Sequence, residues 1–277
     1  MVRFTFADMS GVLGTTAALP NNGSFYKIEK LERKDEIGRI IRKWPGGLGH
    51  GFQRTEAQLK SKGVTVTADM ARKIGSLEVS ALGAFFAFSE GDGRKSLKLL
   101  FSDKVLDTFP KVSRLDFKNM ERLLNVFNIT KACDAATDAV FLGFVADLNI
   151  VQREAVLTAA VNYGEKGVAN MSKKEFRDIF PGNTLEDWSV YSLTAFARAF
   201  SATGAEALVS TDFIARASTL SERTRALMLN EMNSGIDMEK ATSERAISMA
   251  RRNEDVKPET FRMLFNTAMK QRIPLRS

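Results

Sequence analysis

The side chains of this 277-residue chain that could do chemistry are mostly cationic: it holds 40 Lys and Arg, 33 Asp and Glu, one His and one Cys. Cys133 has no disulfide partner within the chain, and Cys133 with His50 supplies too few soft ligands for a structural zinc ion. A serine or cysteine nucleophile would have to use His50 as its base, yet no Gly-x-Ser-x-Gly motif accompanies this residue. We therefore expect no metal, no cofactor and no enzymatic activity.

The loop around His50 contains Gly47-x-Gly49-x-Gly51. No strand pattern precedes it and no Gly-Lys-Ser/Thr follows, so it matches neither the dinucleotide-binding fingerprint nor the phosphate loop of nucleotide hydrolases. We interpret it as a loop that ends the preceding helix.

The positive charge is concentrated in the first half of the chain. Residues 1–131 hold 22 basic and 14 acidic residues, whereas residues 132–277 hold 18 and 19. Such an asymmetry favours a surface that meets a polyanion, either nucleic acid or a membrane surface. The alternative interpretation is an ordinary solvated surface with a biased lysine count.

The clearest basic segment spans residues 35–44. On a helix, its isoleucines and Trp44 share one face and its three cations share the opposite one, which places Trp44 in the core. Further cations follow with few acids between them. The predicted RNA contacts are Arg39, Arg42, Lys43, Arg54, Lys60, Lys62, Arg72, Lys73, Arg94 and Lys95.

The hydrophobic pattern predicts an all-α fold with at most a small β-ribbon. Residues 63–67 alternate and are the best strand candidate, and residues 68–90 predict one buried central helix. Ser172, Thr219 and Ser234 are predicted N-caps, because each precedes an acid by three residues. No repeat of fixed period emerges, which argues against a solenoid. Later helical patterns cover about 95–107, 116–132, 135–148, 151–163, 173–179, 185–202, 206–217, 220–232, 237–252 and 258–270.

We predict a two-lobed molecule with terminal arms: an N-terminal arm (1–24), a basic helical lobe (25–163), a neutral helical lobe (164–270) and a C-terminal tail (271–277). The arms carry apolar side chains without a regular pattern, so they need a groove on a neighbouring copy or on their own subunit. The predicted oligomerisation residues are Phe4, Phe6, Val12, Leu13, Leu19, Ile273 and Leu275. No window approaches the ~18 apolar residues that span a bilayer, so we expect a soluble, cytosolic protein without membrane insertion.

This order of arm, basic lobe, neutral lobe and tail resembles the nucleoproteins of segmented negative-strand RNA viruses, of the orthobunyavirus and tospovirus kind. Residues 4–8 (Phe-Thr-Phe-Ala-Asp) resemble the aromatic-then-acid opening of the orthobunyavirus proteins. Residues 64–67, leading to 72–77, resemble their ribbon and the basic-to-apolar helix that follows it. Residues 180–182 and 258–265 resemble, more faintly, a turn in the middle of the chain and the last helix.

The resemblance implies a viral nucleoprotein that encapsidates single-stranded genomic RNA without sequence preference in a basic cleft. It also implies a homo-oligomer held by exchanged arms, the viral polymerase as a further partner, and a ribonucleoprotein found in host cytoplasm and in the virion. Two other classes stay open: the coat protein of a flexible filamentous RNA virus, and a cellular helical scaffold or adaptor with a basic surface.

Overall fold

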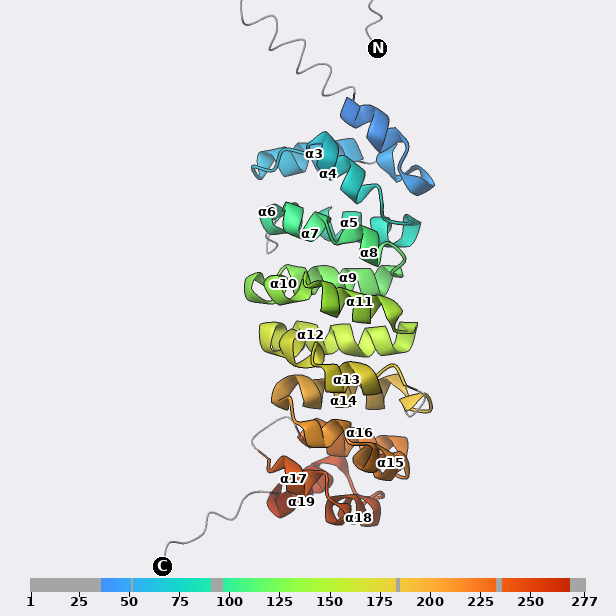
Figure 1. Cartoon of the computed structure of the whole chain (residues 1–277), viewed down its shortest axis with the longest axis vertical. Helices are drawn as coiled ribbons and strands as arrows, with labels where there is room; N and C mark the ends of the chain where they lie inside the picture. The colour runs from blue at the N-terminus through green and yellow to red at the C-terminus, as the bar shows by residue number, and fades with distance from the viewer. Residues whose placement is uncertain (1–35, 51, 91–96, 183–184, 233–235, 270–277) are drawn as a thin grey trace, which may run out of the picture.

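The computed structural model describes residues 36–50, 52–90, 97–182, 185–232 and 236–269, and it is an elongated stack of helices (Figure 1). The predicted all-α class is confirmed, and no strand occurs in these ranges. Residues 36–42 are helical and lead into the first complete element. In chain order the elements are η1 (Pro45–His50), α3 (Phe52–Ser61), α4 (Ala68–Ile74), α5 (Val79–Glu90), α6 (Leu97–Leu100), α7 (Asp103–Leu106), α8 (Phe109–Val112), α9 (Phe117–Phe127), α10 (Thr130–Ala136), α11 (Ala139–Asp147), α12 (Ile150–Met171), α13 (Lys174–Ile179), α14 (Val190–Thr203), η3 (Glu206–Val209), α15 (Thr211–Ser218), α16 (Glu222–Glu231), α17 (Met238–Ala241), α18 (Glu244–Arg252) and α19 (Pro258–Met269).

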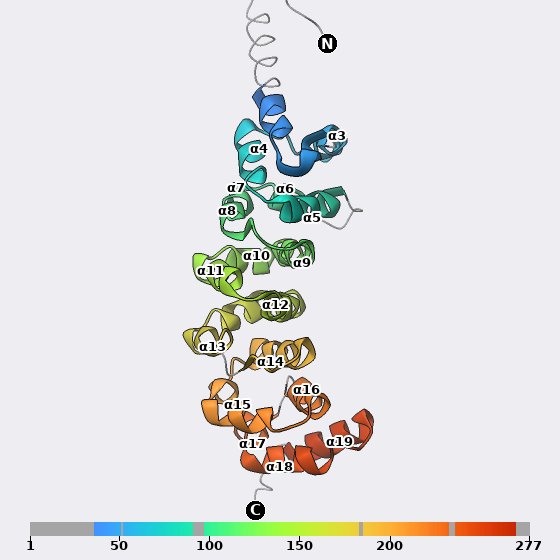
Figure 2. The same ribbon diagram turned by 90° about the vertical axis from the view of Figure 1, so that its right-hand side faces the viewer.

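The helices form two columns (Figure 2). In the first column, α5, α9, α12, α14, α16 and α19 each pack on the next helix in this order. In the second column, α4 packs on α7 and α8, α8 packs on α11, and α15 packs on α18. Because the chain crosses between the columns, each layer of the stack contains a helix from both.

Four of the six first-column helices, α9, α12, α14 and α16, begin with a shared local pattern. In each of these four a buried apolar residue is followed directly by a polar N-cap whose side chain accepts a first-turn N–H. Successive caps lie 33, 40 and 32 residues apart, so the sequence has no fixed period, yet its helices stack as in a solenoid. The expectation against such a stack was wrong, because second-column segments of unequal length make the spacing irregular without preventing the helices from stacking. The four pairs are Leu115-Asp116, Leu148-Asn149, Trp188-Ser189 and Leu220-Ser221.

One apolar core runs through the described layers, and aromatic rings join adjacent helices within it. The Phe176 ring of α13 stacks on Phe180 and on Phe200 of α14, with centroid separations of 4.8 Å in both pairs. At the N-terminal end of the stack, the Trp44 and Phe52 rings meet edge to face at 4.9 Å. Trp44 is 4% exposed, which confirms its predicted place in the core.

The predicted ribbon at residues 63–67 is wrong. Residues 64–67 are neither helix nor strand and pair with no other described segment. Val64 and Val66 are buried, whereas Thr65 and Thr67 are exposed, so the alternation reflects burial on one side of a connecting segment. The Thr67 hydroxyl accepts the Met70 N–H and starts α4.

The single helix predicted over residues 68–90 is two helices, α4 and α5. The break follows Gly75, which caps the C-terminal end of α4. A Cβ at Gly75 would lie 2.6 Å from the Trp44 ring, so this close approach requires a glycine. The Trp44 ring therefore occupies the space that a side chain at position 75 would need.

The predicted boundary between the lobes, at residues 163 and 164, falls inside α12. Gly164 interrupts this helix with φ 56° and ψ −136°, a conformation that L side chains rarely adopt. The whole helix packs on α9 and α10 on one side and on α14 on the other. Whether the kink separates two units of the molecule stays a prediction.

Candidate nucleic-acid interface

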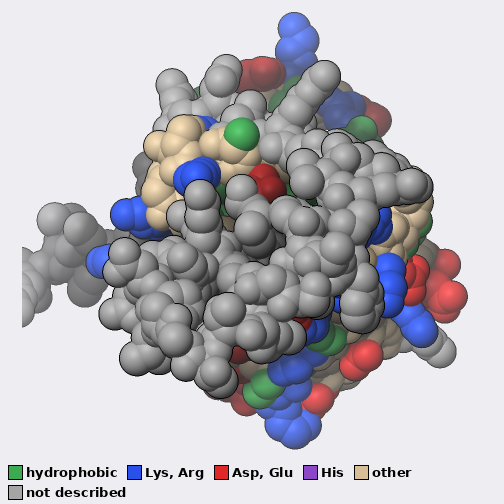
Figure 3. All heavy atoms as spheres, turned by 90° about the horizontal axis from the view of Figure 1, so that it is seen from above, with side chains coloured by type: hydrophobic (Ala, Val, Ile, Leu, Met, Phe, Trp, Pro, Cys, Tyr) green, Lys and Arg blue, Asp and Glu red, His purple; other side chains and the backbone are tan. Residues whose placement is uncertain are grey.

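The excess positive charge lies at the N-terminal end of the stack. Residues 36–77 contain eight Lys and Arg but three Asp and Glu. Figure 3 looks onto this end along the long axis and shows described Lys and Arg side chains around its margin, together with Asp and Glu side chains. The charge asymmetry of the sequence is thus placed at one end of an elongated body.

The helix at residues 36–42 has the predicted two-faced character. Ile41 is 9% exposed, and the Trp44 Nε1–H donates to the Ala71 carbonyl at 3.0 Å, which fixes this helix on α4. The opposite face turns Arg39, Arg42 and Lys43 to solvent. Its apolar side anchors the helix, and its cationic side is presented outward.

A second cationic group lies where α3 ends. Lys60 and Lys62 are exposed on either side of this end. Lys98 of α6, which is not among the ten predicted contacts, joins them: its Cε lies 3.8 Å from where a Cβ at Gly63 would be. Lys98 is 36 residues away from Lys62 in the sequence, so only the folded chain brings Lys98 beside Gly63, the neighbour of Lys62.

Arg72 and Lys73 are exposed in part but their charges are compensated. Arg72 is paired with Glu36, and the Lys73 ammonium lies 2.8, 3.0 and 2.7 Å from carboxylates of α4 and α7 and of the residue that follows α7. Hydrogen bonds to these three carboxylates raise the pKa of Lys73 above its ordinary value. We therefore expect less attraction for a polyanion from this pair than from Arg42 and Lys43. The carboxylates belong to Asp69, Asp103 and Asp107.

Some predicted residues lie outside what the structure describes. Arg54 is on α3, but its side chain is not described. Arg94, Lys95 and all the predicted oligomerisation residues lie outside the described ranges. Their roles stay predictions from the sequence.

Side chains that could act in catalysis or hold a metal ion are few in the described part of the chain. Cys133 is buried, and this burial raises the pKa of its thiol. No three His, Cys, Asp or Glu side chains gather there in a way that could hold a metal ion. None of the described helices is long and apolar enough to cross a bilayer.

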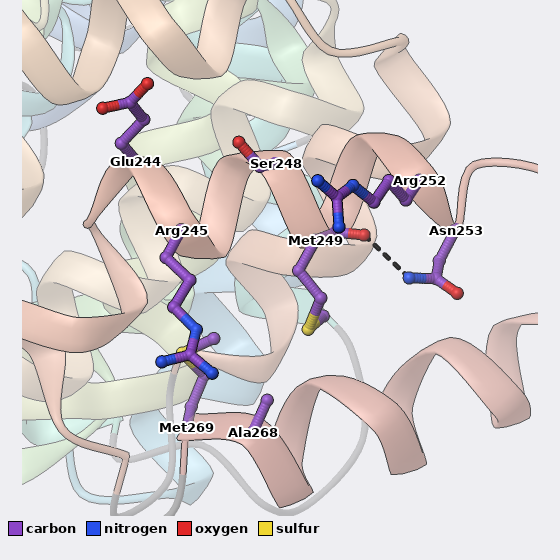
Figure 4. Close-up of a pocket in the computed structure, with 8 residues that line it drawn as sticks. All are labelled: Glu244, Arg245, Ser248, Met249, Arg252, Asn253, Ala268 and Met269. Atoms are coloured by element: carbon purple, nitrogen blue, oxygen red, sulfur yellow. Dashed lines mark hydrogen bonds between the residues drawn. The ribbon is translucent and has the colours of Figure 1, made fainter.

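A groove of about 620 Å³ lies at the other end of the stack, between α18 and α19 (Figure 4). Arg245 and Arg252 project from α18 along it, and Glu244 lines the same groove. Met269, the last described residue, forms part of its wall. This groove thus carries two arginines and one carboxylate.

Comparison of the chain with protein-family models, with curated proteins and with solved structures finds no match in any of the three. A functional conclusion therefore depends on the geometry and the charge described above. The feature that stands out is a set of exposed cations held on a buried aromatic anchor at one end of a helical stack.

Proposed function

We propose that this chain is a nucleoprotein that coats single-stranded RNA without sequence preference and assembles through its terminal segments. The observation that carries the proposal is the group of exposed cations Arg42, Lys43, Lys60 and Lys62 at the N-terminal end of the stack. Side chains of this kind contact phosphates, which supply affinity but carry no sequence information. The resemblance to nucleoproteins of segmented negative-strand viruses supports the viral and single-stranded part of the proposal.

The proposal predicts a steep dependence of RNA affinity on salt. Each neutralised phosphate of a single strand contributes roughly 0.7 to the logarithmic slope, so four contacts contribute roughly 3. Fluorescence anisotropy with short single-stranded RNAs of different sequence measures this slope. We expect similar slopes and affinities for all sequences, whereas an affinity that does not change with salt would exclude the proposal.

The proposal also predicts that deletion of residues 1–20 converts oligomers into monomers that still bind a short RNA. The deleted segment carries Phe4, Phe6 and other large apolar side chains, and burial of each contributes roughly 1.5–3 kcal/mol. The basic end of the stack is left intact. Size-exclusion chromatography with light scattering measures the mass, and a truncated protein with the oligomeric mass of the full chain would contradict assembly through this arm.

A helical scaffold or adaptor is the second candidate, and exposed apolar residues at three successive first-column helix starts favour it. Val79, Phe117 and Ile150 are each the first residue of a first-column helix, and they are 52%, 45% and 58% exposed. The Phe117 ring lies 3.9 Å from where a Cβ at Gly83 would be, so α9 presents this ring beside α5. The nucleic-acid absorbance of protein purified at low salt separates the two functions, because a scaffold would carry no RNA.

A further inference from the structure

A cavity of about 380 Å³ opens between the end of α8 and the junction of α11 with α12. Three of the residues that line it are the cations Lys111, Arg114 and Arg153, and no Asp or Glu lines it. Its volume is at the lower end of the range for ligand pockets in proteins. The cavity is therefore small and open, and three cations line it, of which Arg153 also interacts with the nearby carboxylate of Asp116.

Arg153 supplies a fixed cation in the wall of this cavity. Its Nε donates to the Val145 carbonyl at 2.9 Å, and its Nη2 donates to the carbonyls of Ala146 and Leu148 at 2.9 and 2.7 Å. These bonds satisfy carbonyls at the C-terminal end of α11 and hold the guanidinium in one orientation. A cation that is already ordered loses little conformational entropy when a ligand binds.

The other two cations that line the cavity are exposed to solvent. Lys111 is exposed, and Arg114 contacts Glu78 at 3.4 Å with both side chains largely in solvent. Exposed pairs of this kind contribute little, so Arg114 is readily drawn to a phosphate. The apolar side chains of Val112 and Leu115 also line the cavity, and they are 1% and 3% exposed.

We propose that this cavity holds one nucleotide of a bound RNA, with its phosphate among the three cations and its sugar and base beside Val112 and Leu115. The inference deepens the proposed function and depends on it, because it names a second RNA contact beyond the N-terminal end of the stack. Packed helices connect the two regions: α8 packs on α4, and α4 holds Trp44 and the helix at residues 36–42 (Figure 2).

The test measures binding of uridine monophosphate, uridine and inorganic phosphate to the full chain by calorimetry. We expect uridine monophosphate to bind more tightly than either of the other two probes. Replacement of Lys111 and Arg114 by Ala should weaken its binding by at least about tenfold. Ala146→Phe should have a similar effect without a change in charge, because the ring would fill the cavity.

The control removes two exposed cations elsewhere, Lys131 and Lys166, and should leave binding of uridine monophosphate within about twofold of the parent. Circular dichroism confirms that each variant folds. The inference is overturned if the parent does not bind uridine monophosphate, if inorganic phosphate binds equally well, or if both cavity variants bind as the parent does. If the parent binds uridine monophosphate but its affinity for RNA does not depend on salt, the proposed function alone is rejected.

Discussion

Replacement of Arg42, Lys43, Lys60 and Lys62 by Ala should weaken binding to single-stranded RNA and lower its logarithmic salt slope by roughly 3. The four side chains are exposed, and none of them forms an ion pair with another described residue. The salt bridges at this end are made by Arg72 and Lys73 instead. The thermal midpoint should hardly change, because substitutions of exposed charges alter stability by about 0.5 kcal/mol or less. Anisotropy at several salt concentrations gives the slope, and calorimetry gives the midpoint.

A matched variant removes the same amount of charge from the second half of the chain, at Lys166, Arg245, Arg252 and Lys257. These side chains are also exposed. If net charge alone determined RNA affinity, the two variants would bind equally. We expect the matched variant to keep most of the affinity and slope of the parent, and equal losses would reject the N-terminal end as the interface.

Phe176→Ala should lower the free energy of unfolding by about 3–5 kcal/mol. Phe176 is fully buried, and its ring stacks on Phe180 and on Phe200 with centroids 4.8 Å away in both pairs. Removal of the ring leaves a cavity between α13 and α14 that helices packed on both sides cannot close. The loss is a large part of the 5–15 kcal/mol that stabilises a typical domain.

Urea denaturation measures the effect, and Tyr191→Ala on the neighbouring helix α14 is the control. Tyr191 is 73% exposed, so its removal should change the free energy of unfolding by about 0.5 kcal/mol or less. Losses of similar size in the two variants would contradict the assignment of Phe176 to the core.

The all-α class and the two-faced helix at residues 36–42 were predictable from the sequence, because hydrophobic periodicity is a local property of the chain. The same periodicity placed Trp44 in the core.

Local sequence pattern was less reliable for predicting where helices begin and end. Ser172 and Thr219, predicted as N-caps, are C-caps of α12 and α15, and their hydroxyls donate back to the Val168 and Arg216 carbonyls. Where connections are this short, one hydroxyl can serve the helix before it or the helix after it.

The tertiary structure alone decided which cations are available. Lys73 is predicted as an RNA contact by its sequence neighbours, yet two of its three carboxylates come from residues 103 and 107. Lys98 lies beside Gly63, and Arg153 reaches the cavity beside Lys111, across similar separations in the sequence. The strength of an ion pair or a hydrogen bond depends on the distance in space between the two groups, not on their separation along the chain. The sequence specifies which side chains are charged, but the packing of helices distant along the chain decides whether a charge faces a carboxylate, a carbonyl or solvent.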